Sequence, residues 1–169
     1  SMLEYGMLFV EGDIGIPQNS KEGSKYVRSA AIAGNVDAIG RYGILLKDGK
    51  GVEVDTDEAI KYLKEGIEKG SSITMHGYSR MLNNGEGIPV DYKESIKYYK
   101  MAIDKGNSDA MYNYAVMLKN GQGVPANYKE AIKYYKIAIY KGEDYSMNGY
   151  ANMLMHGLGV PNDCREVTK

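Results

Sequence analysis

Apolar residues recur at helical spacing in short segments that glycine and proline separate. Segment 109–120 places its apolar residues three or four positions apart and contains neither glycine nor proline, so it predicts a helix. Segment 128–141 has the same spacing and predicts a second helix. Gly121 stands where a left-handed helix cap is needed, and Pro125 cannot continue a helix. The pattern therefore predicts two helices joined by a tight turn, here called helix A and helix B.

This hairpin pattern repeats along the chain with a period of 36 residues. Gly-x-Gly pairs begin at Gly49, Gly85, Gly121 and Gly157, and a second series of glycines follows the same interval. A fixed interval of this size is typical of a repeat protein. The chain then forms one continuous array with repeats at about 3–36, 37–72, 73–108 and 109–144 and a truncated repeat at 145–169. We expect Ser1 and Met2 to be a remnant of expression cloning.

Each helix B is preceded by a residue that can cap its N-terminus. The capping residue is Asn or Asp, and a glutamate follows three positions later, which predicts a capping box in every repeat. In such a box each side chain accepts a hydrogen bond from the backbone N–H of the other residue. The five pairs are Asn19/Glu22, Asp55/Glu58, Asp91/Glu94, Asn127/Glu130 and Asp163/Glu166.

Equivalent positions in successive repeats preserve side-chain size, which indicates how the hairpins stack. Two positions of helix B hold small residues and predict close helix packing, and a tyrosine recurs between them at the edge of the core. The small residues are Gly23, Ala59, Ser95 and Ala131, then Ala30, Gly66, Ala102 and Ala138; the tyrosines are Tyr26, Tyr62, Tyr98 and Tyr134. A single hairpin cannot bury both apolar faces, so we expect neighbouring repeats to stabilise one another.

The composition narrows the classes of protein to which this chain can belong. Of its 169 residues, 43% are hydrophobic and 25% are charged, and the formal net charge is −1. Such a balance does not favour a nucleic-acid binder or a membrane-surface domain. The single cysteine, Cys164, excludes an internal disulfide and a cysteine-rich zinc site. Because no signal peptide or long apolar run is found, we expect an intracellular, cytoplasmic protein without membrane insertion.

The repeated pattern resembles the Sel-1-like repeat (SLR), a relative of the tetratricopeptide repeat. The fourth repeat carries the resemblance in Tyr114-Ala115, Gly121-x-Gly123-Val124-Pro125, Asn127-Tyr128, Glu130-Ala131-Ile132, Tyr134-Tyr135, Ala138 and Gly142. The family usually has tryptophan where Tyr62, Tyr98 and Tyr134 stand. The resemblance implies an all-α fold, a right-handed superhelical α-solenoid with helix A on the inner surface and helix B outside. It also implies a protein-binding scaffold or adaptor, the usual role of SLR proteins in signalling and protein quality control.

A tetratricopeptide-like arrangement implies which residues line the inner surface. In the fourth repeat these are positions of helix A that point away from helix B, and a shift of 36 residues gives their equivalents. The candidate protein-binding groove consists of Lys47, His76, Arg80, Asn83, Tyr112, Val116, Lys119, Tyr145, Asn148 and Asn152. Arg and Tyr often dominate interface energetics, and His and Asn can hydrogen-bond a peptide backbone. We therefore expect a partner protein or peptide in this groove; the alternative is that these are ordinary solvated helix positions.

No group of residues in the sequence predicts catalysis, a metal site or a cofactor site. His76 and His156 lie at non-equivalent positions, without a cysteine or carboxylate at ligand spacing. Cys164 takes a position where other repeats have tyrosine, so we interpret it as an apolar filler; the alternative is a mildly reactive thiol at the N-terminus of a helix. The Gly-x-Gly pairs follow no strand and precede no Gly-Lys-Ser/Thr, so they predict helix caps and not a nucleotide site. The lysines of helix B, some of them one turn from a glutamate, predict a solvated outer face.

Three hypotheses about the function belong to different classes of protein. The leading hypothesis is a non-catalytic interaction scaffold that assembles protein complexes. The alternative is the regulatory repeat region of a larger signalling enzyme, such as a protein kinase. A β-lactamase-like hydrolase comes last, because that branch of the family is rich in paired cysteines and this chain has one cysteine. In the truncated fifth repeat Tyr150, Leu154 and Val167 have no following hairpin, so a homodimer through this end is a further prediction.

Overall fold

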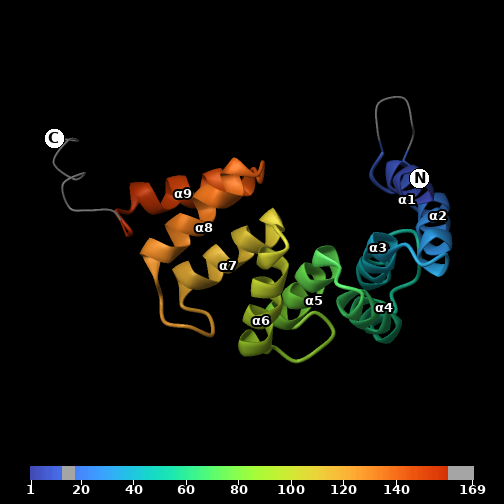
Figure 1. Cartoon of the computed structure of the whole chain (residues 1–169), viewed down its shortest axis with the longest axis horizontal. Coiled ribbons are helices and arrows are strands. Elements are labelled where there is room, and N and C mark those ends of the chain that lie inside the picture. The colour runs from blue at the N-terminus through green and yellow to red at the C-terminus, as the bar shows by residue number, and fades with distance from the viewer. Residues whose placement is uncertain (13–17, 160–169) are drawn as a thin grey trace. The chain divides into compact units, whose positions relative to one another are not determined.

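The computed structural model describes residues 1–12 and 18–159, whose regular structure is entirely helical (Figure 1). The helices in these residues are α1 (Met2–Glu11), α2 (Ser20–Ile32), α3 (Val36–Asp48), α4 (Thr56–Glu68), α5 (Ser72–Asn84), α6 (Tyr92–Asp104), α7 (Ser108–Asn120), α8 (Tyr128–Tyr140) and α9 (Tyr145–Met155). The chain divides into two compact units, Ser1–Val90 and Asp91–Lys169. They are called the N-terminal unit and the C-terminal unit below. The predicted all-α class is confirmed.

Within each unit the helices pack as stacked hairpins. Odd-numbered helices correspond to helix A and even-numbered helices to helix B. In the N-terminal unit α1 packs on α2, α3 packs on α2 and α4, and α5 packs on α3 and α4. In the C-terminal unit α7 packs on α6 and α8, and α9 packs on α8 and α7. Helices α3 and α7 therefore each lie between their own helix B and the preceding one, as repeat stacking requires.

Three of the helices A end at the glycine that the sequence pattern marks as a cap. Gly49, Gly85 and Gly121 adopt the left-handed conformation, with φ angles of 66°, 70° and 69°. Each glycine N–H donates a hydrogen bond to the carbonyl four residues earlier, which satisfies one free acceptor of the last helical turn. The predicted helix ends are confirmed.

The second glycine of each turn is required by packing as well as by backbone conformation. Gly87 and Gly123 have φ angles of 75° and 71°. A methyl group added at Gly87 would lie 2.4 Å from Cγ2 of Thr56, and one at Gly123 would lie 2.4 Å from Cβ of Tyr92. The turn of one repeat thus rests directly on the first residue of helix B in the preceding repeat. Only glycine allows this approach without displacing a neighbour.

The capping boxes predicted at the start of helix B are half formed. The side chain of Asn127 accepts a hydrogen bond from Glu130 N–H at 3.1 Å. The same cap forms at Asn19, Asp55 and Asp91. The backbone N–H of Asn127, however, donates to the Leu118 carbonyl at 2.9 Å and not to the Glu130 side chain. This bond ties the start of helix B to the end of helix A. The predicted pair Asp163/Glu166 lies outside the described residues.

The core contains the small residues that the repeat comparison indicates. Both sets are buried: Gly23, Ala59, Ser95 and Ala131, then Ala30, Gly66, Ala102 and Ala138. The recurring tyrosine is half-buried, and in the fourth repeat the Tyr134 ring packs edge-on against Tyr114 with centroids 5.1 Å apart. The following residue, Tyr99 or Tyr135, is fully buried and supplies the larger core ring.

Candidate protein-binding surface

The candidate groove residues belong to helices A of both compact units. In the N-terminal unit, α3 carries Lys47 and α5 carries His76, Arg80 and Asn83. The C-terminal candidates are Tyr112, Val116 and Lys119 on α7 and Tyr145, Asn148 and Asn152 on α9. The candidates therefore form two surfaces, one in each unit.

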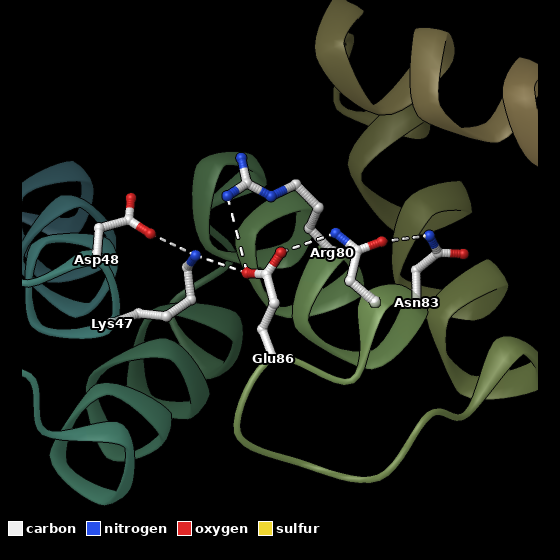
Figure 2. A network of polar contacts seen from close by, with 6 residues as sticks. Lys47, Asp48, Arg80, Asn83 and Glu86 are labelled. Carbon is white, nitrogen blue, oxygen red and sulfur yellow. Dashed lines mark hydrogen bonds and ion pairs between the residues drawn. The ribbon is translucent and has the colours of Figure 1, made fainter.

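Three of the four N-terminal candidates lie together in one polar network (Figure 2). Glu86, in the turn that follows α5, is its centre, and Figure 2 shows Lys47 and Arg80 reaching toward it. Asn83 joins through its neighbour: its Nδ2 donates to Oδ1 of Asn84 at 2.8 Å, and Nδ2 of Asn84 donates to Oε1 of Glu86 at 2.7 Å. The network links the second repeat to the third.

Lys47 is the most deeply buried charge of this network. Its side chain is 9% exposed, and its Nζ lies 2.5 Å from Oδ1 of Asp48 and 2.6 Å from Oε2 of Glu86. An ammonium group so far out of water is stable only when carboxylates or carbonyls pair with it. Lys47 therefore serves first as a cross-link between α3 and the turn after α5.

The surroundings of Glu86 favour its ionised form. Partial burial acts to raise its pKa, but hydrogen bonds from Asn84 and Lys47 and the positive charges of Lys47 and Arg80 outweigh it. The pKa of the Glu86 carboxyl is consequently held below its ordinary value. Glu86 is thus a fixed negative charge at neutral pH.

Arg80 is the charge of the network that remains accessible. Its side chain is 40% exposed, and its Nη2 lies 3.8 Å from Oε2 of Glu86, beyond hydrogen-bond distance. The same carboxylate already accepts hydrogen bonds from Lys47 and Asn84. The Arg80 guanidinium therefore keeps donors that a carboxylate or carbonyl from outside can use.

The C-terminal candidates include an aromatic cluster on α7, α8 and α9. The Tyr112 ring lies 6.1 Å from Tyr135 and 6.2 Å from Tyr145, measured between centroids. Tyr135 is fully buried, and this burial, together with Tyr112 and Glu143, raises its pKa to about 12. Tyr145 is largely exposed. The cluster runs from the core to the surface, with Tyr145 as its exposed end.

The remaining C-terminal candidates flank this cluster with mixed polarity. Val116, Lys119 and Asn152 are partly buried, and Asn148 is exposed. The backbone carbonyl of Asn152 lies 2.8 Å from Nδ1 of His156. No ion pair involving these four candidates is found among the described residues.

Two important residues were not among the sequence candidates. Glu86 lies between the two glycines of a turn and is not among the sequence candidates, and the equivalent position holds Lys50, Gln122 and Leu158 in other repeats. This change of charge at one repeated position is the signal that could have identified it. Tyr135 enters the sequence pattern only as part of the family resemblance, and nothing in the sequence places its ring beside Tyr112.

Within residues 1–12 and 18–159, no three His, Cys, Asp or Glu side chains converge in a way that could hold a metal ion. None of the helices described there is long and apolar enough to cross a membrane. Cys164 lies outside the described residues.

Comparison with solved structures shows similar helical repeat proteins. A Sel1 repeat protein from Oxalobacter formigenes has a TM-score of 0.78 and 26% identity, over 94% of this chain and 64% of that one. The protective antigen c5321 of uropathogenic Escherichia coli, which displays an SLR fold, has a TM-score of 0.74 and 24% identity, over 95% of this chain and 34% of that one. This chain therefore spans less than two thirds of either protein.

A third structure is similar in fold alone. Cysteine rich protein B of Helicobacter pylori has a TM-score of 0.60 and 20% identity, over 74% of this chain and 95% of that one. No curated protein matches the chain.

A family model decides the assignment. The Sel1 repeat model matches five consecutive segments, residues 1–35, 36–71, 72–107, 108–143 and 144–166. These matches cover almost the whole chain, and the all-α repeat solenoids described above agree with them. The chain belongs to the Sel1 repeat family.

Proposed function

We propose that this chain is a non-catalytic interaction scaffold that binds a partner protein or peptide on the surface of its helices A. Sel1 repeat proteins are generally protein-interaction modules and are typically non-catalytic. Within each unit, stacked hairpins present a row of helix positions, which suits an extended partner better than a small substrate. The partner contacts proposed below concern each compact unit by itself.

The accessible guanidinium of Arg80 is the observation that carries the proposal. The Glu86 carboxylate accepts hydrogen bonds from Lys47 and Asn84. Arg80 lies beside this carboxylate, 3.8 Å away, without forming a hydrogen bond to it. Arginine is enriched at binding hot spots because it contributes charge, several donors and a flat apolar face. An acidic side chain of the partner is the group that best fits this position.

Tyr145 supports a second contact in the C-terminal unit. The Tyr145 ring is exposed and packs against the Tyr112 ring, so a partner would contact an aromatic group that is already positioned. Pre-positioning reduces the conformational entropy lost on binding. Asn148, exposed one turn along α9, adds hydrogen-bonding capacity for a peptide backbone.

Titration of a purified partner tests this function. A partner captured on the immobilised chain is purified and titrated by calorimetry against the wild type, Arg80→Ala and Tyr145→Ala. We expect each substitution to weaken binding by about tenfold, as hot-spot truncations do. Lys93→Ala, at an exposed position of α6 outside the candidate surface, is the control and should bind normally. Unchanged affinity of both Arg80→Ala and Tyr145→Ala would reject the helix A surface.

A further inference from the structure

A cavity lies between two helices A of the N-terminal unit, α1 and α3. Its volume is about 130 Å³, and apolar side chains of both helices line it, Met7 and Val10 from α1 and Ile44 and Leu45 from α3. Val10 and Leu45 are buried, while Met7 and Ile44 are partly exposed, so the cavity is an apolar hollow with its opening at the surface. The charged residues that line it are Glu11, Arg41, Asp48 and Lys50.

The next pair of helices A fills the equivalent place with an ion-pair network. There the Lys47 ammonium group pairs with Asp48, its neighbour at the end of α3, and with Glu86, which follows the glycine that ends α5 (Figure 2). Counted from the glycines that end α1 and α3, the equivalents of these three residues at the cavity are Val10, Glu11 and Lys50. The network cannot form at the cavity, because Val10 is uncharged and Lys50 has the opposite sign to Glu86.

Two cations at the cavity consequently lack a carboxylate partner. No ion pair of Arg41 or Lys50 is found among the described residues. Asp48 is already held by Lys47 at 2.5 Å, and Glu11 is exposed, where water and salt screen its charge. Arg41 is partly exposed and Lys50 is exposed, so both can donate hydrogen bonds to a carboxylate from outside the chain.

The size of the cavity determines which side chain fits it. An apolar cavity of roughly 150 Å³ in a protein core can hold a benzene molecule. The cavity between α1 and α3, at about 130 Å³, therefore suits one aliphatic or methionine side chain. Transfer of a leucine side chain from water to such a place strengthens binding by about tenfold or more.

The cavity belongs to the interior of the array and not to one of its ends. Its lining residues come from α1, α3 and the turn after α3, and both helices pack on α2. Additional repeats of a solenoid stack on its first or last helices. They would extend the array beyond these helices and would not lie between α1 and α3. Occupation of this cavity therefore does not depend on a continuation of the repeats.

We propose that this cavity is an anchor site for a partner protein: it takes one leucine-sized side chain, and Arg41 and Lys50 bind a carboxylate next to that side chain. The inference rests on the proposed function and names the chemistry that the partner segment needs. Ile44 connects the cavity with Arg80, because a methyl group added at Gly77 would lie 3.3 Å from Cδ1 of Ile44, and Arg80 follows Gly77 by about one helical turn. A segment anchored in the cavity can therefore reach Arg80 with a second acidic side chain.

Titration with a minimal probe tests the anchor site. N-acetyl-leucine carries both the aliphatic side chain and the carboxylate, and it is added to the full chain labelled at its methionine and isoleucine methyl groups. We expect the nuclear magnetic resonance signals of Met7 and Ile44 to shift, with a dissociation constant of about 1 mM for a ligand of this size. N-acetylglycine lacks the side chain and should bind at least about tenfold more weakly. N-acetyl-leucine amide lacks the carboxylate and should bind about threefold more weakly.

Matched variants of the chain locate the bound probe. Val10→Lys combined with Lys50→Glu copies the ion pair found between α3 and α5 into the cavity and should abolish the shifts. Arg41→Ala should weaken the binding of N-acetyl-leucine about threefold and leave that of the amide unchanged, because only the acid carries a charge. Arg28→Ala makes the same change at an exposed position of α2 outside the cavity and should have no effect. Circular dichroism checks that each variant is folded.

Three outcomes would overturn the proposal. The first is no shift at Met7 or Ile44 with N-acetyl-leucine at about 20 mM, well above the expected dissociation constant. The second is binding that the double variant retains or that N-acetylglycine matches. The third is a set of nuclear Overhauser contacts from residues 13–17 to the Met7 methyl group, in which case the occupant is a segment of this chain. If Arg80→Ala still weakens binding of the purified partner, the proposed function stands and the anchor site alone is rejected.

Discussion

At the scale of single residues, the network around Glu86 shows how a repeat accommodates buried charge. Lys47 is nearly covered, and two carboxylates offset the cost of removing its ammonium group from water. The lowered pKa of Glu86 means that its ionised form is favoured more in the folded than in the unfolded chain. Glu86 therefore stabilises the fold above its ordinary pKa, and this contribution is lost as the pH falls through the lowered, folded-state pKa.

Replacement of Glu86 by glutamine tests this contribution. We expect Glu86→Gln to lower the free energy of unfolding by about 1–2 kcal/mol at pH 7, because Lys47 and Arg80 lose their charged partner. The difference from wild type should shrink in acid, where the wild-type carboxyl is also neutral. Urea unfolding at a series of pH values measures it. Glu53→Gln, at an exposed position of the preceding turn, is the control. A loss that does not depend on pH would contradict the electrostatic explanation.

At the scale of elements, the turns between helices A and B determine how closely repeats approach. The first glycine of each turn ends helix A, and the second lets the turn rest on the preceding helix B. Replacing the two glycines costs different amounts of stability. A positive φ strains the backbone of any other residue, and a side chain at a close contact also displaces a neighbour. Gly123 carries both demands, whereas Gly142 has a φ of 85° and no atom within 4 Å of an added methyl group.

Alanine at these two glycines separates backbone strain from packing. We expect Gly142→Ala to cost about 1 kcal/mol, the penalty of the left-handed conformation. Gly123→Ala should cost about 1–3 kcal/mol more, because its methyl group would lie 2.4 Å from Cβ of Tyr92. Urea unfolding of both variants provides the comparison. Equal losses would show that packing at Tyr92 does not require glycine.

At the scale of the whole molecule, stability is a sum over repeats and the interfaces between neighbours. Within the C-terminal unit, α7 packs on both α6 and α8, while Met147 and Leu154 of α9 are 52% and 45% exposed. A helix with fewer packed neighbours opens at a lower free-energy cost. The two helices are comparable because both are helices A and occupy equivalent positions of the repeat pattern.

Hydrogen exchange followed by mass spectrometry tests this difference in local stability. We expect amides of α9 to exchange at least about tenfold faster than those of α7, because among the described residues α7 packs on α6, α8 and α9, whereas α9 packs on α8 and α7. Equal protection of α7 and α9 would contradict this dependence of local stability on packed neighbours.

Most of the fold could be predicted from the sequence because its determinants are local and repeated. A cap such as Gly121, an N-cap such as Asn127 and the helical spacing between them each act within a few residues. Five copies in register reinforce every local signal, so the hairpin pattern and the small core positions are correct. The reciprocal half of the capping box was wrong because the Asn127 N–H found a nearer acceptor in helix A, the Leu118 carbonyl.

The sequence by itself determined the period, the helices and the residues that could face a partner. The tertiary structure decided which of them are covered, because burial depends on neighbours that lie a whole repeat away. Lys47 is enclosed by Glu86, 39 positions later, while Arg80 remains accessible beside the same carboxylate. Met111 and Met147 hold equivalent positions, yet only Met147 is exposed, because only α7 packs against a helix B of its own repeat among the described residues.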